Sequence, residues 1–233
     1  MDLKLKGKVV LILGGTGGIG SAITAEFQKE GASVCAHGRS GNYATDLTSE
    51  DAMAGLVEKA MKQFGRVDTV INSLSTPVKH GALESKKWSD FQDQIDVQTR
   101  SFVDLLPLVV PTMKRQGGGR IINILTTYVI GQPPSGLADY VTAKYALLGL
   151  TKAAARELGK YHITVNAVSP SFIRNKFTDR IPEKFDELLI SQTPLGRLAT
   201  PEDVARTVLF LASEKAEFIT GENIIVAGGQ TMD

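Results

Sequence analysis

Short apolar runs alternate with longer stretches of helical spacing along the chain. The first run, residues 8–13, is almost continuously apolar, as expected for a strand that is buried on both faces. Further strands are predicted at residues 33–37, 67–71, 120–125, 163–168 and 224–227. Helices are predicted between them, at about residues 18–30, 50–64, 88–116, 138–158 and 202–211. This alternation predicts an α/β fold: a Rossmann-like doubly wound parallel sheet in three layers, α/β/α, as a single domain over residues 1–233.

One interval between the predicted elements is unusually short. The second strand ends near Arg39, and Asp46-Leu47 follows after only six residues. Parallel neighbours usually need a crossover of about a dozen residues or more. Either an edge strand around residues 43–45 is a stub, or the sheet lacks its usual crossover helix at this point.

The composition is ordinary for a globular protein. The chain has 233 residues, of which 42% are hydrophobic and 22% are charged, and this suits one domain. The formal net charge of +1 disfavours nucleic acid as the main partner, because phosphate backbones select strongly basic surfaces. The single cysteine, Cys35, excludes an intramolecular disulfide and a cysteine-rich zinc site, so no metal is expected. Its apolar neighbours predict a buried thiol.

The hydropathy pattern predicts neither a signal peptide nor a membrane-spanning segment. Residues 1–6 lack the apolar core of a signal peptide, and no apolar run is long enough to span a bilayer. A cytoplasmic protein with no membrane partner is the simplest expectation.

A glycine-rich loop lies between the first strand and the first helix. It contains Gly14, Gly18 and Gly20, with Thr16 and Ile19 between them. At such a junction the backbone amides and the helix N-terminus can face a pyrophosphate, and positions without side chains let the backbone approach it. The spacing is wider than the G-x-G-x-x-G fingerprint. The alternative is a tight strand-to-helix turn without a ligand.

The end of the second strand bears on the choice of cofactor. An acidic residue there would accept hydrogen bonds from an adenosine ribose and favour NAD. This chain has His37-Gly38-Arg39-Ser40 instead, and His37 is expected to pack or to face solvent. Arg39 can hold a 2′-phosphate through charge-assisted hydrogen bonds, so NADP(H) is predicted in preference to NAD(H). The alternative is a solvated surface arginine.

Tyr140 and Lys144 lie one turn apart on the same face of a predicted helix. A free phenol has a pKa of about 10, and acid–base chemistry near neutrality needs a value near 7. A nearby ammonium favours the phenolate and lowers the pKa of the phenol. The Tyr-x-x-x-Lys spacing alone is common by chance. It gains weight because the preceding strand ends in two hydroxyls, Thr126 and Thr127, which can hold a substrate carbonyl beside the phenol.

Together these motifs resemble the short-chain dehydrogenase/reductase family, over nearly the whole chain. The family's T-G-x-x-x-G-x-G pattern matches residues 13–20, with Leu13 in place of threonine, and its Y-x-x-x-K is intact. Further positions are similar to the family's cofactor-contacting segments: Asp46 and Leu47 to the adenine pair, Asn72 and Ser73 to the start of N-N-A-G, and Pro170, followed by Ile173, to the nicotinamide segment. The resemblance implies that these residues bind the cofactor, together with the glycine loop, Arg39 and Ser40.

The resemblance also implies a reaction. Hydride would move between nicotinamide and a substrate carbon, while Tyr140 gives or takes the proton and Lys144 lowers the pKa of the phenol and holds the ribose. Two of the family's catalytic positions are altered in this chain. The usual serine becomes a threonine: counting forward from Arg120 gives Thr126 and counting back from Tyr140 gives Thr127, and Thr126 is preferred.

The second altered position is the family's helix asparagine, which becomes Gln98, with the same amide on a longer arm. The resemblance points loosely to the 3-oxoacyl thioester reductase branch, with a carbonyl or alcohol substrate that is free or carrier-bound. Lys114 and Arg115 would either meet an acidic carrier protein or form a solvated helix end. Residues 171–192 are expected to form a substrate lid. The altered positions keep open an alternative, a non-catalytic cofactor-binding or regulatory member of the same fold.

The helix predicted at residues 138–158 is apolar over more than one face, at Ala143, Ala146, Leu147, Leu150, Ala153 and Ala154. Part of this surface can pack on the sheet, and the remainder indicates a partner. Because members of the family often pair through this helix, a homotetramer or a homodimer is expected, with the tetramer favoured.

Overall fold

Seven parallel strands form one sheet, in the order β3-β2-β1-β4-β5-β6-β7, within residues 2–38, 40–47, 51–174 and 182–232, which a computed structural model describes. The strands are β1 (Val9–Leu13), β2 (Ser33–Gly38), β3 (Tyr43–Ala44), β4 (Thr69–Asn72), β5 (Gly119–Ile124), β6 (Ile163–Pro170) and β7 (Asn223–Val226). The chain winds outward from β1 to β3 and then, on the other side, from β4 to β7. The winding reverses between β1 and β4, which is where doubly wound sheets bind ligands, at the carboxyl ends of the strands.

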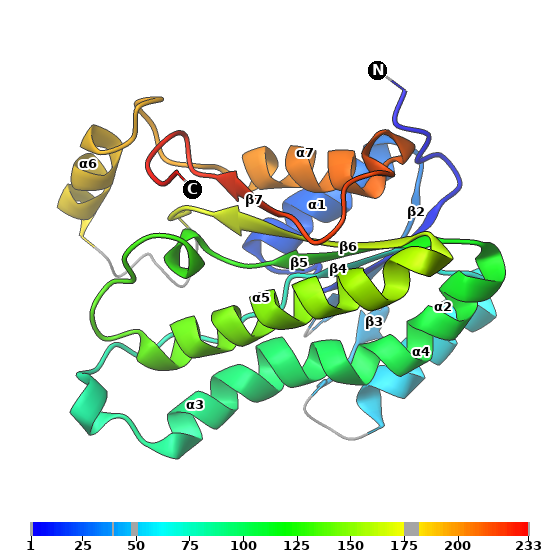
Figure 1. Cartoon of the computed structure of the whole chain (residues 1–233), viewed down its shortest axis with the longest axis horizontal. Helices are drawn as coiled ribbons and strands as arrows, with labels where there is room; N and C mark the ends of the chain where they lie inside the picture. Colours follow the sequence, from blue (N-terminus) through cyan, green and yellow to red (C-terminus); the bar gives the residue numbers. More distant parts are fainter. Residues whose placement is uncertain (1, 39, 48–50, 175–181, 233) are drawn as a thin grey trace.

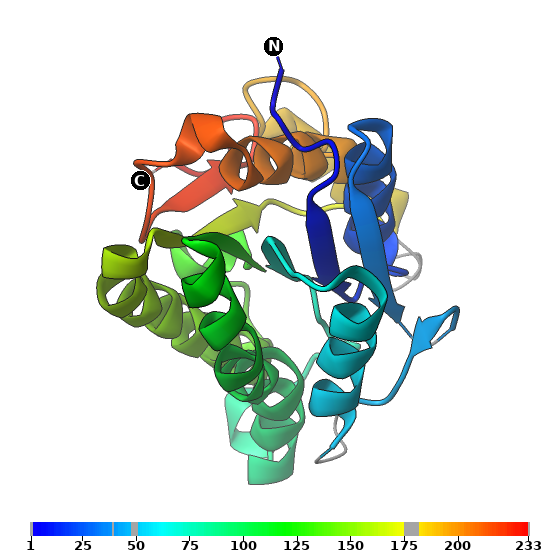
Figure 2. The ribbon, with the colours of Figure 1, turned by 90° about the vertical axis from the view of Figure 1, so that its right-hand side faces the viewer.

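Helices cover both faces of the sheet and give three layers (Figures 1 and 2). One face carries α1 (Gly18–Lys29) and α7 (Pro201–Ala212), and the other carries α2 (Ala52–Phe64), α4 (Ser101–Gln116) and α5 (Ala138–Leu158). The predicted Rossmann-like fold is confirmed. The ends of the predicted strands and helices are shifted by one or two residues at most, apart from the elements described below.

The sheet separates two apolar cores, and β1 supplies both. Val9, Leu11 and Leu13 pack in the core beneath α2, α4 and α5, whereas Val10 and Ile12 pack in the core beneath α1 and α7. All five residues of β1 are buried. An alternating pattern would leave one face of the strand polar, so the continuous apolar run follows from burial on both sides.

The short interval after the second strand ends in a stub. The two-residue strand β3 pairs with β2 in parallel, through His37 with Tyr43 and Gly38 with Ala44. Only residues 39–42 separate the two strands. The edge strand is therefore a stub, and the four residues before it are too few to form the usual crossover helix, so both alternatives hold.

The long helix predicted at residues 88–116 consists of three segments: α3 (Trp88–Ile95), a π-helical turn η2 (Asp96–Arg100), and α4. The helical path is continuous, but the wider turn changes which side chains point inward after residue 95. Pro107 and Pro111 lie on the exposed face of α4. The carbonyl groups that lose a helical partner there can bond to water, which explains why the helix tolerates both prolines.

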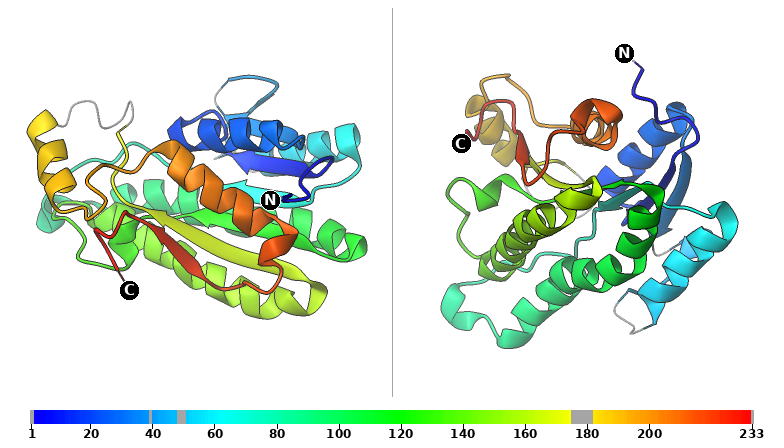
Figure 3. Two further views of the ribbon diagram at one scale, coloured as in Figure 1. Left: turned by 90° about the horizontal axis from the view of Figure 1, so that it is seen from above. Right: turned by 45° about the vertical axis from the view of Figure 1, so that its right-hand side comes forward.

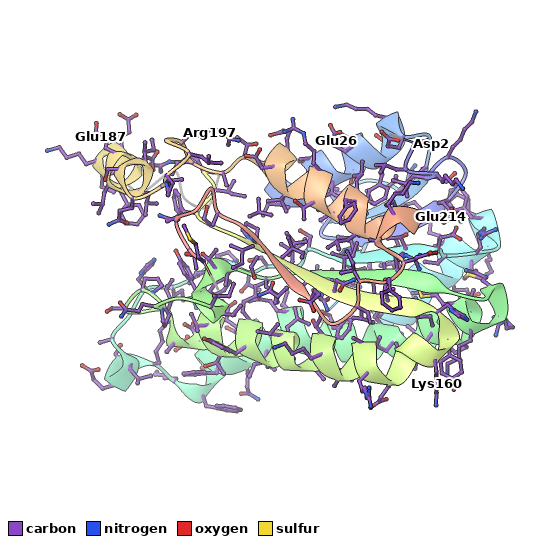
Figure 4. All side chains as sticks on the ribbon, turned by 45° about the horizontal axis from the view of Figure 1, so that its top comes forward. Asp2, Glu26, Lys160, Glu187, Arg197 and Glu214 are labelled. Atoms are coloured by element: carbon purple, nitrogen blue, oxygen red, sulfur yellow. The ribbon has the colours of Figure 1, made fainter. Side chains whose placement is uncertain are left out.

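One helix was not predicted, α6 (Glu183–Ser191), and the remaining elements are the 3₁₀ turns η1 (Leu83–Ser85), η3 (Thr127–Val129), η4 (Gly159–Tyr161) and η5 (Glu214–Ala216). Helix α6 and the start of α5 lie at the same end of the molecule (Figure 1). In Figure 4, Glu187 of α6 and Arg197 mark this end, and Lys160, just beyond α5, marks the opposite one. Seen from above, α7 (orange) crosses over the strands, and α6 (gold) lies apart from it at the far left of the view (Figure 3, left).

Candidate functional site

Five strands bring predicted site residues to one edge of the sheet. Gly14 follows β1, Gly38 ends β2, Asn72 ends β4, Thr126 lies two residues beyond β5, and Pro170 ends β6. Because these strands are parallel, all five residues lie at the carboxyl edge, where α/β proteins bind their ligands.

The glycine loop is held by two close backbone approaches. Gly14 has a φ of +76°, and a Cβ there would lie 2.5 Å from the carbonyl oxygen of Ser73. A Cβ on Gly20 would lie 2.1 Å from the carbonyl oxygen of Gly14. Neither position accepts a side chain, so the sequence identified a real constraint. Residues 16–18 are exposed where α1 begins, and Gly17 has no side chain that could cap the helix. The Gly17 amide donates to the carbonyl oxygen of Gly14 at 3.0 Å, so the amides that can face an anion here are those at the start of α1.

His37 connects this loop to the edge strand. The amide of Gly14 donates to His37 Nδ1 at 3.3 Å, and His37 Nε2 lies 3.0 Å from the carbonyl oxygen of Thr45. The geometry requires a neutral ring whose proton is on Nε2. Burial lowers the pKa of His37, which favours that neutral form. His37 packs, as one of the two sequence expectations had it, and the hydrogen bond to the loop was not foreseen.

Gly38 is in close contact with the glycine loop. A Cβ on Gly38 would lie 1.8 Å from Thr16 Oγ1 and 2.7 Å from Thr16 Cβ. Rotation of the Thr16 side chain does not move its Cβ, so no rotamer makes room. A carboxylate side chain at position 38, the one that would bind the ribose of NAD, does not fit against this loop.

The structure describes some, but not all, of the other residues that are predicted to contact the adenosine. Arg39 lies outside the described residues. Ser40 and Asp46 are exposed, and Leu47 is half-buried against the core beneath α2.

Tyr140, Lys144 and Thr126 converge at the start of α5. Lys144 is 3% exposed, and its Nζ donates to the carbonyl oxygen of Ile124 at 2.7 Å. The same Nζ lies 5.8 Å from the centre of the Tyr140 ring. The Thr126 side chain forms a hydrogen bond with the Tyr140 phenol. Thr127 is also buried and begins η3, but the contact with the phenol comes from Thr126.

The sequence analysis expected the pKa of the Tyr140 phenol to be lowered towards 7. The surrounding protein groups do not lower it. Burial raises the pKa of Tyr140 above its ordinary value, and nearby Tyr128 adds to this, whereas the hydrogen bond from Thr126 acts in the opposite direction. Burial also lowers the pKa of Lys144, to about 7. The expectation that Lys144 lowers the pKa of the phenol is therefore wrong for the protein alone. The site holds Tyr140 as a neutral acid, which is the form that can donate a proton.

Gln98 lies in the π-helical turn and is fully buried. Its Nε2 donates to Gln94 Oε1 at 2.5 Å, and Gln94 Nε2 donates to the carbonyl oxygen of Pro77 at 3.4 Å. Asn72 Nδ2 donates to the backbone oxygen of Gln98 at 3.4 Å. Gln98 Oε1 is buried and has no hydrogen-bond partner within the described part of the chain. A buried acceptor of this kind is a usual position for a bound water.

Gln94 was missed from the sequence, although it precedes Gln98 by four residues on the same helical path. Ser73 contributes its carbonyl oxygen to the close approach at Gly14. Pro170, at the end of β6, and Ile173, three residues further on, are buried. Within the predicted lid, residues 175–181 lie outside the described residues. Arg174 joins the segment after β6 to α6, because its Nε and Nη2 donate to the carboxylate of Asp186 at 3.0 and 2.7 Å.

No helix within the described ranges combines the length and the apolar character that crossing a bilayer requires. Within the same ranges, no group of three or more His, Cys, Asp or Glu side chains is arranged to hold a metal ion.

Known proteins match the chain over nearly its full length. A family model described as enoyl-(acyl carrier protein) reductase matches residues 14–231. The 3-oxoacyl-(acyl-carrier-protein) reductase FabG of Thermotoga maritima is 35% identical, over 97% of this chain and 99% of its own. The 3α-hydroxysteroid dehydrogenase of Mediterraneibacter gnavus is 33% identical, over 98% of each chain. The ligand-free structure of Thermoplasma acidophilum aldohexose dehydrogenase has a TM-score of 0.90 and 27% identity, over 99% of this chain and 96% of that one.

Replacing Lys144 with Met should remove a pH-dependent part of the stability. The folded-state pKa of about 7 lies below the ordinary value of 10.5, so the unfolded chain binds a proton that the folded chain does not bind between these values. The contribution of Lys144 is complete above pH 10.5 and is lost as the pH falls through 7. Between pH 7.5 and 9.5 the wild type should gain about 2 kcal/mol of unfolding free energy relative to the variant.

Urea denaturation of both proteins at each pH measures this difference. The other ionisable groups are common to both proteins, so their contributions cancel. Parallel pH dependence in the two proteins would contradict the assignment of a low pKa to Lys144.

Proposed function

Because the chain belongs to the short-chain dehydrogenase/reductase family, we propose that it is an NADP(H)-dependent oxidoreductase that reduces a ketone or 3-oxoacyl carbonyl to an alcohol, or catalyses the reverse reaction. Family membership alone makes it an oxidoreductase acting on carbonyl or alcohol groups. The observation that carries the finer proposal is the convergence of the Tyr140 phenol, the Thr126 side chain and the buried Lys144 ammonium at the carboxyl edge of the sheet.

The residues at this edge suit a dinucleotide. The amides at the start of α1, beside the exposed residues 16–18, would bind the pyrophosphate. Asn72, Ser73, Pro170 and Ile173 would border the nicotinamide ribose and ring, following the family pattern. Lys144 uses one of its three donors on Ile124, so two remain for ribose hydroxyls. When bound, the reduced cofactor supplies a hydride to the substrate carbon.

The side chains of the protein would supply the proton and return it. Tyr140 is held neutral by burial, so it can donate its proton to the carbonyl oxygen as charge develops there. With substrate bound, Thr126 would turn its single O–H from the phenol to the carbonyl oxygen and donate a second hydrogen bond there. A protonated Lys144 would then stabilise the phenolate that remains. Gln98, with its unpaired Oε1, would hold a water that returns the proton.

The proposed preference for NADP(H) rests on two features of the second strand. Thr16 leaves no space for a carboxylate at position 38, so the acid that would bind the NAD ribose is excluded by packing. Arg39 follows directly and offers five donors to a 2′-phosphate. Ser40, Asp46 and Leu47 would complete the adenosine site.

A 3-oxoacyl thioester is the substrate class that we favour. Among the similar proteins, the Thermotoga maritima reductase is named for that substrate, although the others are named for a steroid and for a sugar. A carrier protein would approach the carboxyl edge of the sheet, with residues 171–192 closing as a lid over the substrate. We place the protein in the cytoplasm, in keeping with its composition.

Replacing Tyr140 with Phe should abolish turnover, because no proton donor would remain at the carbonyl oxygen. We expect kcat to fall by about 10²–10⁴-fold, while the Kd for NADPH stays within about twofold of the wild-type value. The measurement is NADPH oxidation with a panel of ketones and 3-oxoacyl thioesters, together with calorimetric titration of NADPH.

Residual turnover of the Phe variant above a few per cent would point to another proton donor. If the wild type binds NADPH but turns over no member of the panel, the non-catalytic alternative is favoured.

Replacing Arg39 with Ala should weaken NADPH binding much more than NADH binding. Loss of the charge-assisted phosphate contacts should cost about 1.5–3 kcal/mol for NADPH. The titration of NADH with the same variant is the internal control, because NADH lacks the 2′-phosphate. Equal losses for both cofactors would overturn the proposed preference.

We also propose a homotetramer or homodimer that pairs through α5. Its outer face is exposed at Tyr145, Ala146, Gly149 and Ala153, a surface of small and aromatic side chains. Light scattering should give about 100 kDa for a tetramer of the 25.0 kDa chain, or about half of that for a dimer. A mass near 25 kDa would exclude both.

A pair of glycine variants tests the contact surface. A Cβ at Gly149 of α5 or at Gly55 of α2 meets no atom within 4 Å, so the fold of one subunit tolerates a side chain at either position. Gly149→Arg should lower the mass that light scattering reports, and Gly55→Arg should not.

A further inference from the structure

A buried ion pair joins the loop after β4 to the start of α5. Lys86 Nζ donates to Asp139 Oδ1 at 2.9 Å, and the two side chains are only 4% and 3% exposed. Every other ion pair given for the described residues leaves both side chains more than a tenth exposed. Asp139 directly precedes Tyr140 in the chain. The pair therefore lies beside the proposed proton donor. It connects this position to Lys86, which lies 53 positions earlier in the chain.

Stability alone does not account for the pair. Two charges that leave water carry a desolvation cost of several kcal/mol per ion, and their attraction often only offsets that cost. Apolar side chains of similar volume would satisfy the packing equally well or better. A buried pair is better explained where a defined geometry is needed.

Two further hydrogen bonds hold the same loop. Lys86 Nζ also donates to the carbonyl oxygen of Lys79, at 2.5 Å, which closes residues 79–86 on themselves. The amide of Gly81 donates to the carbonyl oxygen of Gly136 at 3.2 Å. Gly136 has a φ of +83°, and a Cβ there would lie 3.3 Å from the Gly81 nitrogen, so a larger residue would push the two loops apart.

Packing contributes little to holding the loop. Residues 82–85 are exposed. A cavity of about 480 Å³, whose lining includes Lys79, Gln94 and Asp139, separates the loop from α3. The polar ties therefore fix the loop where apolar contacts do not.

The first turn of α5 also requires a polar contact to fix its position. Leu137 occupies the N-cap position, and its side chain forms no capping hydrogen bond. One turn later the helix is anchored twice, because Thr99 Oγ1 donates to the carbonyl oxygen of Ala143 at 3.0 Å and Lys144 binds Ile124. In the first turn itself, Asp139 supplies an anchor in addition to the contact between Tyr140 and Thr126, and its negative charge is favourable at a helix N-terminus.

From these contacts we propose that Lys86 and Asp139 are positioning residues that fix the first turn of α5, and with it the Tyr140 phenol, against the loop at residues 79–86. The proposal rests on the proposed role of Tyr140 as the proton donor. Loss of the pair would leave the cofactor contacts in place and misalign the phenol relative to the carbonyl oxygen. A misplacement of about 1 Å is enough to lower the rate by up to about 100-fold.

The test uses the full-length protein with both charges replaced, Lys86→Met/Asp139→Leu. The double change leaves no buried charge unpaired, so the fold should survive. Lys62→Met is the matched control, because it breaks the exposed pair with Glu58 on α2, far from the site. Each protein is assayed for its NADPH-binding stoichiometry and Kd, for kcat at saturating NADPH and 3-oxoacyl thioester, and for amide hydrogen exchange by mass spectrometry.

We expect the double variant to bind one NADPH per chain with a Kd within about twofold of the wild type, and to lose at least about 10-fold in kcat. Amides of residues 138–143 should exchange at least about 10-fold faster, while those of residues 151–158 should keep the wild-type rates. A merely structural role would lower the bound NADPH and kcat in parallel. The Lys62→Met control should match the wild type throughout.

Unchanged exchange at residues 138–143 would overturn the proposal, whether or not the protein is active. A kcat within twofold of the wild type would overturn it as well, provided that Tyr140→Phe abolishes turnover in the same assay. If Tyr140→Phe keeps its activity, the proposed function fails instead, and the exchange data alone decide whether the pair orders α5.

Discussion

The site depends on one buried hydrogen bond, from the Lys144 ammonium to the carbonyl oxygen of Ile124. Ile124 is the last residue of β5, so the bond fixes the register of α5 against the end of the central strands. Tyr140 lies one turn before Lys144, and Thr126 lies two residues after Ile124. This contact between helix and strand thus helps to bring the phenol and the hydroxyl together. The cost of burying the ammonium is visible in its pKa, which falls to about 7.

A second constraint joins the two halves of the sheet. Where the winding reverses, Gly14 after β1 approaches the Ser73 carbonyl after β4 so closely that a Cβ is excluded. The same loop touches β2 through Thr16 and Gly38, and it is bonded to His37. The proposed cofactor half of the site is thus built from close contacts of the loop backbone, with little space for variation. The proposed catalytic half is built from side chains on α5 and on the segment after β5.

Much of this could be predicted from the sequence, because the signals were local. Strands such as β1 are buried on both faces, and burial on both faces requires a continuous run of apolar residues. Gly14 and Gly20 could be identified because only glycine fits there. The helix α6 escaped prediction, since it is short and has no buried residues. The π-helical turn at residues 96–100 was hidden because the apolar spacing of a helix continues on both sides of it.

The features that the sequence could not supply are contacts between distant segments. Thr126 and Thr127 are equivalent as neighbours in sequence, and only the contact with Tyr140 separates them. The predicted direction of the shift in the Tyr140 pKa was wrong, because a motif specifies which groups are near and not how deeply they are buried. Gln94 and Lys86 carried no motif at all.

The division between the two halves bears on the choice of substrate. Proteins named for an acyl carrier thioester, a steroid and a sugar match this chain over nearly its whole length, so a common scaffold serves different substrates. The strand ends and the glycine loop cannot make the distinction, since their geometry is set by the backbone contacts described above. The distinction must come from the segments that surround the carboxyl edge: the loop after β4, the residues between β5 and α5, and the segment that includes α6. Two of these three are joined by Lys86, Asp139 and the Gly81–Gly136 bond. In this chain, therefore, the contacts that we propose to order the first turn of α5 also join two of the segments that border the proposed substrate site.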